Sequence, residues 1–139
     1  MVRYALALSA MLLALGPAAV WAGGWALGGM DAVAYAADGA AVPGAAGIST
    51  RWAGQEWHFQ SVENRAAFEA NPRAYAPGLK GLCPVSLAEG HATPGDPRFF
   101  AIVGQRLYLL QSAGARARFL QDPRGWLMKA KGNFVKLGR

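Results

Sequence analysis

The sequence is poor in the residues that build metal, disulfide and catalytic sites. It holds one cysteine, Cys83, and two histidines, His58 and His91, among 139 residues. A lone cysteine excludes an internal disulfide, and these three residues do not follow the local spacing of a zinc site. Nucleophilic serine motifs, phosphate-binding loops and nucleic-acid-binding motifs are absent as well. The sequence therefore gives no support to a common hydrolase, a nucleotide-binding enzyme or a nucleic-acid partner.

Long hydrophobic runs are also lacking. The one strongly apolar run spans residues 5–15, and it is much shorter than the roughly 20 residues that a transmembrane helix needs. Arg3 precedes this run, and a small-residue pattern ending at Ala22 follows it. This order predicts a signal peptide at residues 1–22, cleaved after Ala22, in an exported, periplasmic protein. A membrane anchor is the alternative interpretation.

The remaining chain divides into a short tail and one domain. Glycine and alanine dominate its first residues, so we expect 23–28 to form a flexible N-terminus. Residues 29–139 are long enough to form a single domain with one core.

The segment 48–75 predicts a β-hairpin followed by a helix. Trp57 and Phe59 alternate with polar residues, which places both aromatic side chains on one face of a strand. Ser61 is a good N-cap for the helix that follows. The helix should end before Pro72, because proline fits the first position of a new helix.

The same pattern returns 51 residues later in the chain. Matching residues stand at Gln60-Ser61 and Gln111-Ser112, Arg65-Ala66 and Arg116-Ala117, Phe68 and Phe119, and Pro72-Arg73 and Pro123-Arg124. A Gly-Gln pair, at 54–55 and 104–105, matches at an offset of 50. We therefore predict an α+β fold, in which two β-hairpin plus helix units pack into one small domain with a short antiparallel sheet covered by helices.

Three packing predictions follow from this arrangement. Phe68 and Phe119 should both be buried on the inner faces of corresponding helices. The second hairpin, near 99–110, is apolar on both faces, as a central strand pair would be. A helix that starts at Pro123 carries apolar residues at helical spacing, and we expect this stripe to cover the sheet.

Charge is distributed unevenly along the chain. Residues 23–97 contain four Lys or Arg and seven Asp or Glu, whereas 98–139 contain nine basic residues and one acidic residue. A basic second half is typical of a protein that docks on an acidic partner or an anionic membrane surface. We expect Arg116, Arg118 and Lys129 to belong to this surface. Solubility alone is the other explanation.

Pro84 and Gly90 bracket a predicted short helix, and Cys83 stands at its start. Free cysteine is among the residue types most often buried, so we predict that Cys83 is buried. The alternative is an exposed, reactive thiol, because a helix N-terminus and the nearby Lys80 would both favour the thiolate.

With these residues placed, the chain from about residue 28 resembles the exported, single-domain members of the YHS-domain family. The resemblance lies in GMDAVAY (29–35), WHFQSVENRAAF (57–68) and NPRAYAP (71–77), and continues in KGLC (80–83), GDP (95–97), LYL (107–109) and KA (129–130). It implies a small α+β domain, found alone in exported proteins and fused in copper-transporting ATPases and multicomponent oxygenases.

Metal-associated short forms of that family carry two cysteines after the hairpin, where this chain has Gln60 and Asn64. Amides are poor ligands for soft metals, so metal binding by that route is not expected. The remaining donors for a copper or iron ion are Cys83, His58 and His91, with Met30 and Asp31 as further candidates.

Three classes of function are consistent with this sequence. The first is a non-catalytic binding or sensing module, linked to a metal ion, a small ligand or redox chemistry. The second is an interaction protein that docks through its basic half on an acidic protein or an anionic membrane. The third is an enzyme with Cys83 as nucleophile and a histidine as base, for which no local motif exists. We favour the first.

Overall fold

The computed structural model describes residues 24–137, so the predicted signal peptide at 1–22 lies outside the described residues. No helix in the described range is long and apolar enough to cross a membrane. The elements follow the order η2 (Ala26–Gly29, a 3₁₀ helix), α1 (Ala32–Ala37), β1 (Ala45–Trp52), β2 (Gln55–Phe59), α2 (Val62–Ala70), α3 (Pro72–Tyr75), η3 (Gly78–Gly81, a 3₁₀ helix), α4 (Pro84–Ala88), β3 (Asp96–Val103), β4 (Arg106–Leu110), α5 (Ala113–Gln121) and α6 (Pro123–Leu137).

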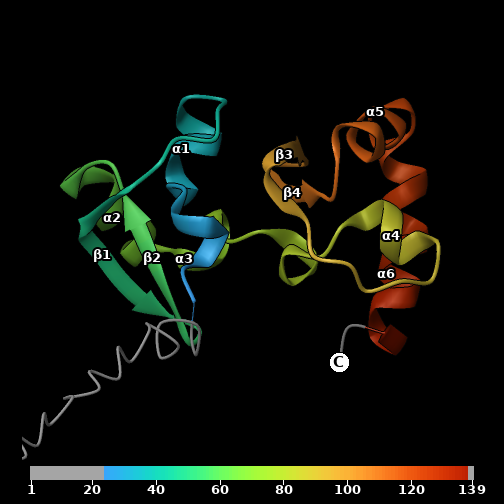
Figure 1. Ribbon diagram of the computed structural model, residues 1–139, viewed down its shortest axis with the longest axis horizontal. Coiled ribbons are helices and arrows are strands. Elements are labelled where there is room, and N and C mark those ends of the chain that lie inside the picture. Colours follow the sequence, from blue (N-terminus) through green and yellow to red (C-terminus); the bar gives the residue numbers. More distant parts are fainter. Residues whose placement is uncertain (1–23, 138–139) are drawn as a thin grey trace, which may run out of the picture.

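The chain folds as two halves that lie side by side (Figure 1). The first half, residues 24–76, contains the hairpin β1–β2 and helices α1 to α3. The second half, residues 77–137, contains the hairpin β3–β4 and helices α4 to α6. Each hairpin is a separate two-stranded antiparallel sheet. The predicted α+β class is confirmed, with the sheet divided between two hairpins and the helices packed against them.

The predicted internal repeat is present in three dimensions. Strands β1 and β3 have 8 residues each, and β2 and β4 have 5 each. Ser61 caps α2 by accepting a hydrogen bond from the N–H of Asn64 at 3.1 Å, and Ser112 caps α5 in the same way from Ala115 at 3.0 Å. Both helices therefore begin through the same local interaction, as the matching Gln-Ser pairs predict.

The hairpin turns correct one detail of the sequence alignment. Ala53 and Gly54 form the first turn, and Gly104 and Gln105 form the second, all four with positive φ. Such a pair of left-handed residues is typical of a two-residue hairpin loop. The turns are thus equivalent at an offset of 51, and the match of the two Gly-Gln pairs at 50 does not reflect structural equivalence. Glycine occupies the second turn position in one hairpin and the first in the other.

The repeat also includes elements that the sequence pattern did not connect. The 3₁₀ helices η2 and η3 each contain two consecutive left-handed residues, at 27–28 and 79–80. Each is followed by a short helix whose N-cap residue is Asp31 in α1 and Cys83 in α4. Each half therefore runs through a 3₁₀ helix, a short helix, a hairpin and a capped helix in the same order.

A pair of equivalent glycines lets the chain pass close to each hairpin. A Cβ atom on Gly44 would lie 2.4 Å from the carbonyl carbon of His58, and one on Gly95 would lie 2.4 Å from the Cβ of Leu109. Both distances are far below van der Waals contact, so any larger residue would push the segment off the strand. The same constraint at both positions supports the equivalence of the two halves.

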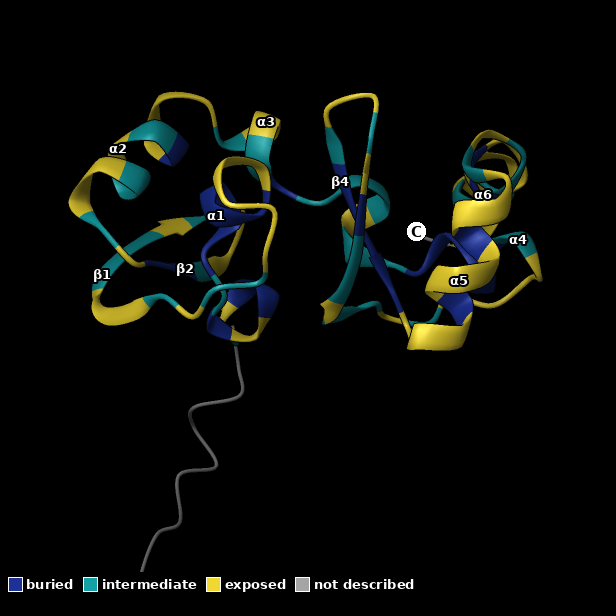
Figure 2. Cartoon of the chain, turned by 90° about the horizontal axis from the view of Figure 1, so that it is seen from above, coloured by how far each residue is buried: buried dark blue, intermediate teal, exposed yellow. Residues whose placement is uncertain are grey.

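Strand β4 lies between the two cores of the molecule (Figure 2). Leu107 and Leu109 belong to the core of the first half, although they come from the second. Tyr108 and Leu110 alternate with them and belong to the core of the second half. The predicted burial on both faces holds for β4, but the hairpin is a separate two-stranded sheet and not the central pair of a larger one, and Ile102 on β3 is 43 % exposed.

Two expectations about the ends of the domain are corrected. We expected residues 23–28 to be flexible, but Ala26 and Leu27 are buried in the first core, and Trp25 bridges to Glu56 on β2. Their apolar side chains give this segment a hydrophobic reason to pack. Helix α6 was expected to cover the sheet, but it packs mainly against α4.

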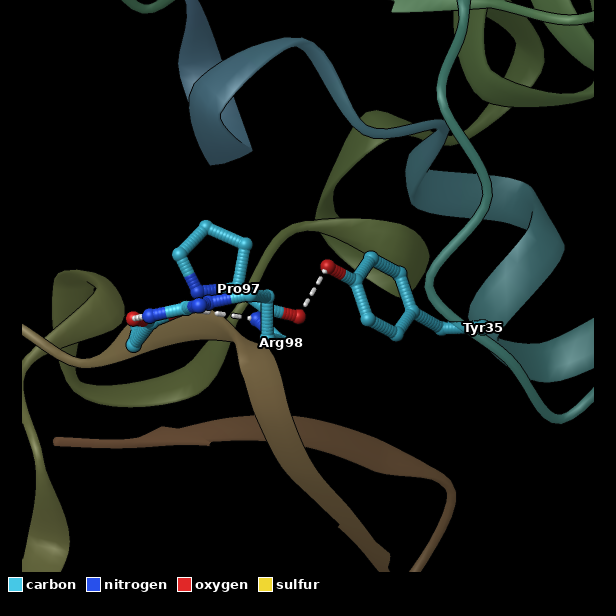
Figure 3. Close-up of polar contacts among 4 residues, drawn as sticks. Tyr35, Pro97 and Arg98 are labelled. Carbon is cyan, nitrogen blue, oxygen red and sulfur yellow. Dashed lines mark hydrogen bonds and ion pairs between the residues drawn. The ribbon is translucent and has the colours of Figure 1, made fainter. Parts of the chain in front are cut away.

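Tyr35 links the two halves directly. Its side chain is 1 % exposed, and its hydroxyl donates a 2.7 Å hydrogen bond to the carbonyl oxygen of Pro97 (Figure 3). The ring packs edge-on against Phe100, with centroids 4.8 Å apart. Burial, and secondly the charge of Asp96, raise the pKa of the Tyr35 hydroxyl well above its ordinary value. The halves thus meet through a neutral tyrosine held in an apolar contact.

This contact predicts a loss of stability at alkaline pH. Tyr35 ionises in the unfolded chain near the ordinary pKa of about 10, while the folded chain holds its proton, so the free energy of unfolding falls as pH rises above about 10. We expect Tyr35→Phe to cost about 1 kcal/mol at neutral pH through the lost hydrogen bond, and to weaken the alkaline decline. Urea unfolding across pH measures both. Tyr75→Phe is the control, and an unchanged alkaline decline in Tyr35→Phe would contradict the prediction.

Phe68 and Phe119 are both 0 % exposed, which confirms the predicted burial of this pair. Each forms part of a different core. We therefore expect Phe68→Ala and Phe119→Ala each to lower the free energy of unfolding by about 3–5 kcal/mol. Glu69→Ala on the exposed side of α2 should cost well under about 1 kcal/mol. Chemical denaturation measures all three, and a small effect at Phe119 would be inconsistent with equivalent cores.

Candidate functional site

The structure does not gather the predicted metal ligands into one site. His58 lies on β2 in the first half, Cys83 lies at the start of α4 in the second, and His91 is exposed after α4. Within residues 24–137, no group of three or more His, Cys, Asp or Glu side chains is placed to hold a metal ion. Met30 and Asp31, the two further candidates, do not complete such a group.

The alternation along β2 places His58 on the face opposite Trp57 and Phe59, the face on which the sequence has polar residues. Its residue is in fact 2 % exposed, because Trp25 from the N-terminal segment covers it with ring centroids 4.3 Å apart. Its Nε2 lies 2.9 Å from Oε1 of Glu56. This packing explains why the segment before η2 is attached to the domain.

Asp31 is a fully buried carboxylate whose oxygens are satisfied by the protein. Its Oδ1 accepts from the backbone N–H groups of Val33 at 2.8 Å and Ala34 at 3.3 Å, which caps α1. Its Oδ2 accepts from the N–H of Gln60 at 2.9 Å and the side-chain amide of Asn64 at 2.8 Å. The carboxylate therefore locks α1 to the start of α2, and four donors compensate its desolvation.

Gln60 and Asn64, the two residues considered above for metal binding, both donate hydrogen bonds within the protein. The side-chain amide of Asn64 donates to Asp31, and that of Gln60 donates to Asp38 at 3.0 Å. An amide nitrogen that donates a proton is not available as a metal ligand. These residues do not fit a thiophilic metal ion, and their observed role is structural.

The second half replaces this polar network with apolar contacts. Cys83 stands at the position equivalent to Asp31, and Ala115 stands at the position equivalent to Asn64. Both belong to the second core. The side-chain acceptor and its side-chain donor are replaced together, and among the described residues no buried side-chain nitrogen or oxygen lacks a hydrogen-bond partner.

The predicted burial of Cys83 is confirmed, since its side chain is 0 % exposed. Its backbone N–H donates to the carbonyl of Thr93 at 2.8 Å, and its side chain makes no cap hydrogen bond. A catalytic thiol needs access to substrate and a base within hydrogen-bond reach. The surroundings of Cys83 are those of a packing residue.

Two arginines of the basic half have structural partners. Arg116 donates through Nε to the carbonyl of Phe100 at 2.7 Å. Arg118 pairs with Glu89, and its guanidinium lies 5.0 Å from the ring centroid of Trp126. These side chains tie α5 to β3, α4 and α6, so the basic surface is not composed only of free charges.

Two surface concavities adjoin at Lys80, where the two halves meet. The first, which we name the tryptophan hollow, has a volume of about 450 Å³ and is lined by Trp52, Gln55, Trp57, Ala76, Pro77 and Lys80, beside Ala53. The second, the cationic hollow, has a volume of about 360 Å³ and is lined by Gly78, Lys80, Arg106, Tyr108, Lys131 and Phe134, with Pro77 and Leu79. Pro77 and Lys80 line both, so the hollows adjoin.

The segment between the hollows is held in an unusual backbone conformation. Leu79 and Lys80 have φ of 55° and 53°. Left-handed φ costs non-glycine residues on the order of 1–2 kcal/mol each. The equivalent residues of the first half are Leu27 and Gly28, so the second half carries a lysine where the first has the residue that relieves this strain.

Gly78 lets this segment lie flat against β4. A Cβ atom there would come within 2.5 Å of the Tyr108 ring and 3.1 Å of Arg106. Arg106 in turn donates through Nη1 to the carbonyl of Arg73 at 2.8 Å, which fixes its guanidinium beside the hollow. The backbone at Gly78 and the side chain of Arg106 are thus positioned by contacts within the protein.

Sequence reasoning missed this site because its residues come from distant segments. The tip of the first hairpin, the linker between the halves, β4 and α6 each contribute lining side chains. The equivalence of Lys80 and Gly28 follows from the matching left-handed residues of the two 3₁₀ helices, which only the structure shows.

Comparison with known proteins adds no further identification. Neither a protein-family model, nor a curated protein, nor a solved structure gives a significant match to this chain.

The packing of Cys83 predicts its chemical behaviour. We expect a thiol-alkylating reagent to label Cys83 only when the protein unfolds, because the side chain is enclosed in the second core. Cys83→Ala should cost about 1 kcal/mol, and Cys83→Ser should cost more, since a buried hydroxyl at this apolar position needs a partner. Labelling followed by intact mass, together with denaturation curves, measures these effects. Fast labelling of the native protein would contradict the assignment.

Proposed function

We propose that this protein is an exported, YHS-type domain that binds a small ligand without chemical turnover, and that the ligand site is the pair of hollows around Lys80. The proposal combines the sequence resemblance with the geometry between the halves. Export rests on the predicted signal peptide, which lies outside the described residues.

The observation that carries this proposal is the strained lysine between two concavities. Strained, non-glycine backbone persists where the surrounding structure enforces it, and it gathers at ligand and switch sites. Both hollows, at about 450 and 360 Å³, fall within the usual size range of small-molecule sites. Residues of both hairpins contribute to the walls.

The tryptophan hollow favours a flat, apolar group. Trp52 and Trp57 stand on neighbouring strands with ring centroids 5.7 Å apart and an interplanar angle of 62°. The indole N–H of Trp57 donates to the carbonyl of Trp52 at 2.9 Å, so its orientation is fixed before any ligand arrives. Preorganised aromatic walls lower the entropic cost of binding a ring.

Three alternatives have less support from the geometry. A metal-sensing role needs ligands that converge, and residues 24–137 contain no such group. A cysteine enzyme needs an accessible thiol, but Cys83 is 0 % exposed. Docking through the basic half is the third alternative, and two of the arginines predicted for it, Arg116 and Arg118, already bond within the protein.

A neutral aromatic probe tests the binding proposal. We expect naphthalene-2-carboxamide to shift the indole N–H resonances of Trp52 and Trp57 in ¹⁵N-labelled protein, while Trp126 on α6 stays unchanged. Trp52→Leu should weaken this binding about tenfold, the size of losing one aromatic wall. Trp126→Leu is the matched control and should retain it. Absence of shifts, or shifts spread across the whole protein, would contradict a ligand site at the tryptophan hollow.

A further inference from the structure

We propose that the ligand class of this site is an aromatic carboxylate, with its ring in the tryptophan hollow and its carboxylate beside Lys80, Arg106 and Lys131. This inference rests on the proposed ligand site and deepens it. We infer the negative charge of the ligand from the cationic side chains where the two halves meet.

Three cationic side chains line the cationic hollow: Lys80, Arg106 and Lys131. No acidic side chain lines either hollow among the residues that the structure describes. Elsewhere in the second half, basic groups do have acidic neighbours, as Arg118 has Glu89 and Arg98 has Asp96. An anion is the ligand that balances this concentration of positive charge.

Arg106 is suited to recognise a carboxylate. Its Nη1 donates to the carbonyl of Arg73, which orients the guanidinium and uses one of its five N–H donors. The planar arrangement of the remaining donors matches the two oxygens of a carboxylate. Tyr108 and Phe134 provide apolar walls nearby, which reduce the screening of such a contact by water.

Lys80 places a positive charge beside the tryptophan hollow as well as the cationic hollow, because it lines both. The tryptophan hollow contains no other cationic lining residue. A ring lying against Trp52 and the small accessible part of Trp57, which is 3 % exposed, would therefore carry its negative group on the side that faces Lys80. This position also explains a lysine at left-handed φ, where Gly28 occupies the equivalent place in the first half.

A matched pair of probes tests the charge preference. Naphthalene-2-carboxylate and naphthalene-2-carboxamide have the same ring and differ in the charge of the attached group. We expect isothermal titration calorimetry to show at least tenfold tighter binding of the carboxylate by the full mature chain. The preference should shrink as the salt concentration rises, because ions screen exposed charges.

Two lysines on α6 provide a variant and its control. Lys131→Gln should weaken carboxylate binding several-fold and leave carboxamide binding unchanged. Lys129→Gln removes the same charge from the same helix at an exposed position outside both hollows, and should change neither. An equal loss of carboxylate binding in both variants would overturn the assignment, because it would indicate a general effect of net charge.

Two substitutions of Lys80 separate charge from backbone strain. Lys80→Gln and Lys80→Gly should both reduce the carboxylate preference at least several-fold. Only Lys80→Gly should raise the midpoint of thermal unfolding, because glycine accepts a left-handed φ without steric cost. If both variants keep the parent's preference, Lys80 does not contact the ligand and the inference is wrong.

The two proposals fail in different ways. Equal affinity of the parent protein for both probes overturns the aromatic-carboxylate inference and leaves the binding site intact. Binding of neither probe overturns the binding site itself, and the inference with it. Tighter binding of the carboxylate that persists in Trp52→Leu would also overturn the inference, since the anion would then bind without the ring.

Discussion

Burial of β4 on both faces is the constraint on which the rest of this structure depends. Leu107 and Leu109 enter the core of the first half, while Tyr108 and Leu110 enter the core of the second. A two-stranded hairpin alone is marginally stable in water, so each face needs a cover. The two halves supply these covers, and the boundary between them, with its hollows, is a consequence of sharing one strand.

The two halves share a backbone plan and differ where their roles differ. In the first half, the N-cap residue of α1 is the buried Asp31, which accepts a hydrogen bond from Asn64. In the second half, Cys83 and Ala115 occupy the equivalent positions and pack in the second core. The 3₁₀ segments differ in the same manner, with Gly28 in one half and Lys80 in the other. Departures from the repeat therefore identify both the structural lock and the proposed ligand site.

Local features of the fold were predictable because they depend on neighbouring residues. Alternating aromatics predict β2, serine caps predict the starts of α2 and α5, and prolines predict the restarts at Pro72 and Pro123. The burial of Cys83 followed from residue type. The burial of His58 on the polar face of β2 was not predicted, because its cover, Trp25, comes from a segment whose composition indicated flexibility.

The sequence by itself determined the α+β class, the two hairpin and helix units and their offset, because short-range hydrogen bonding and hydrophobic periodicity specify these elements. Only the tertiary structure decided which polar and charged side chains lie close together. It separated His58 from Cys83, gave Asp31 its amide partners, and brought Lys80, Arg106 and Lys131 to one hollow. Packing between distant segments sets those distances, and no local pattern in a chain records which of its surfaces will face one another.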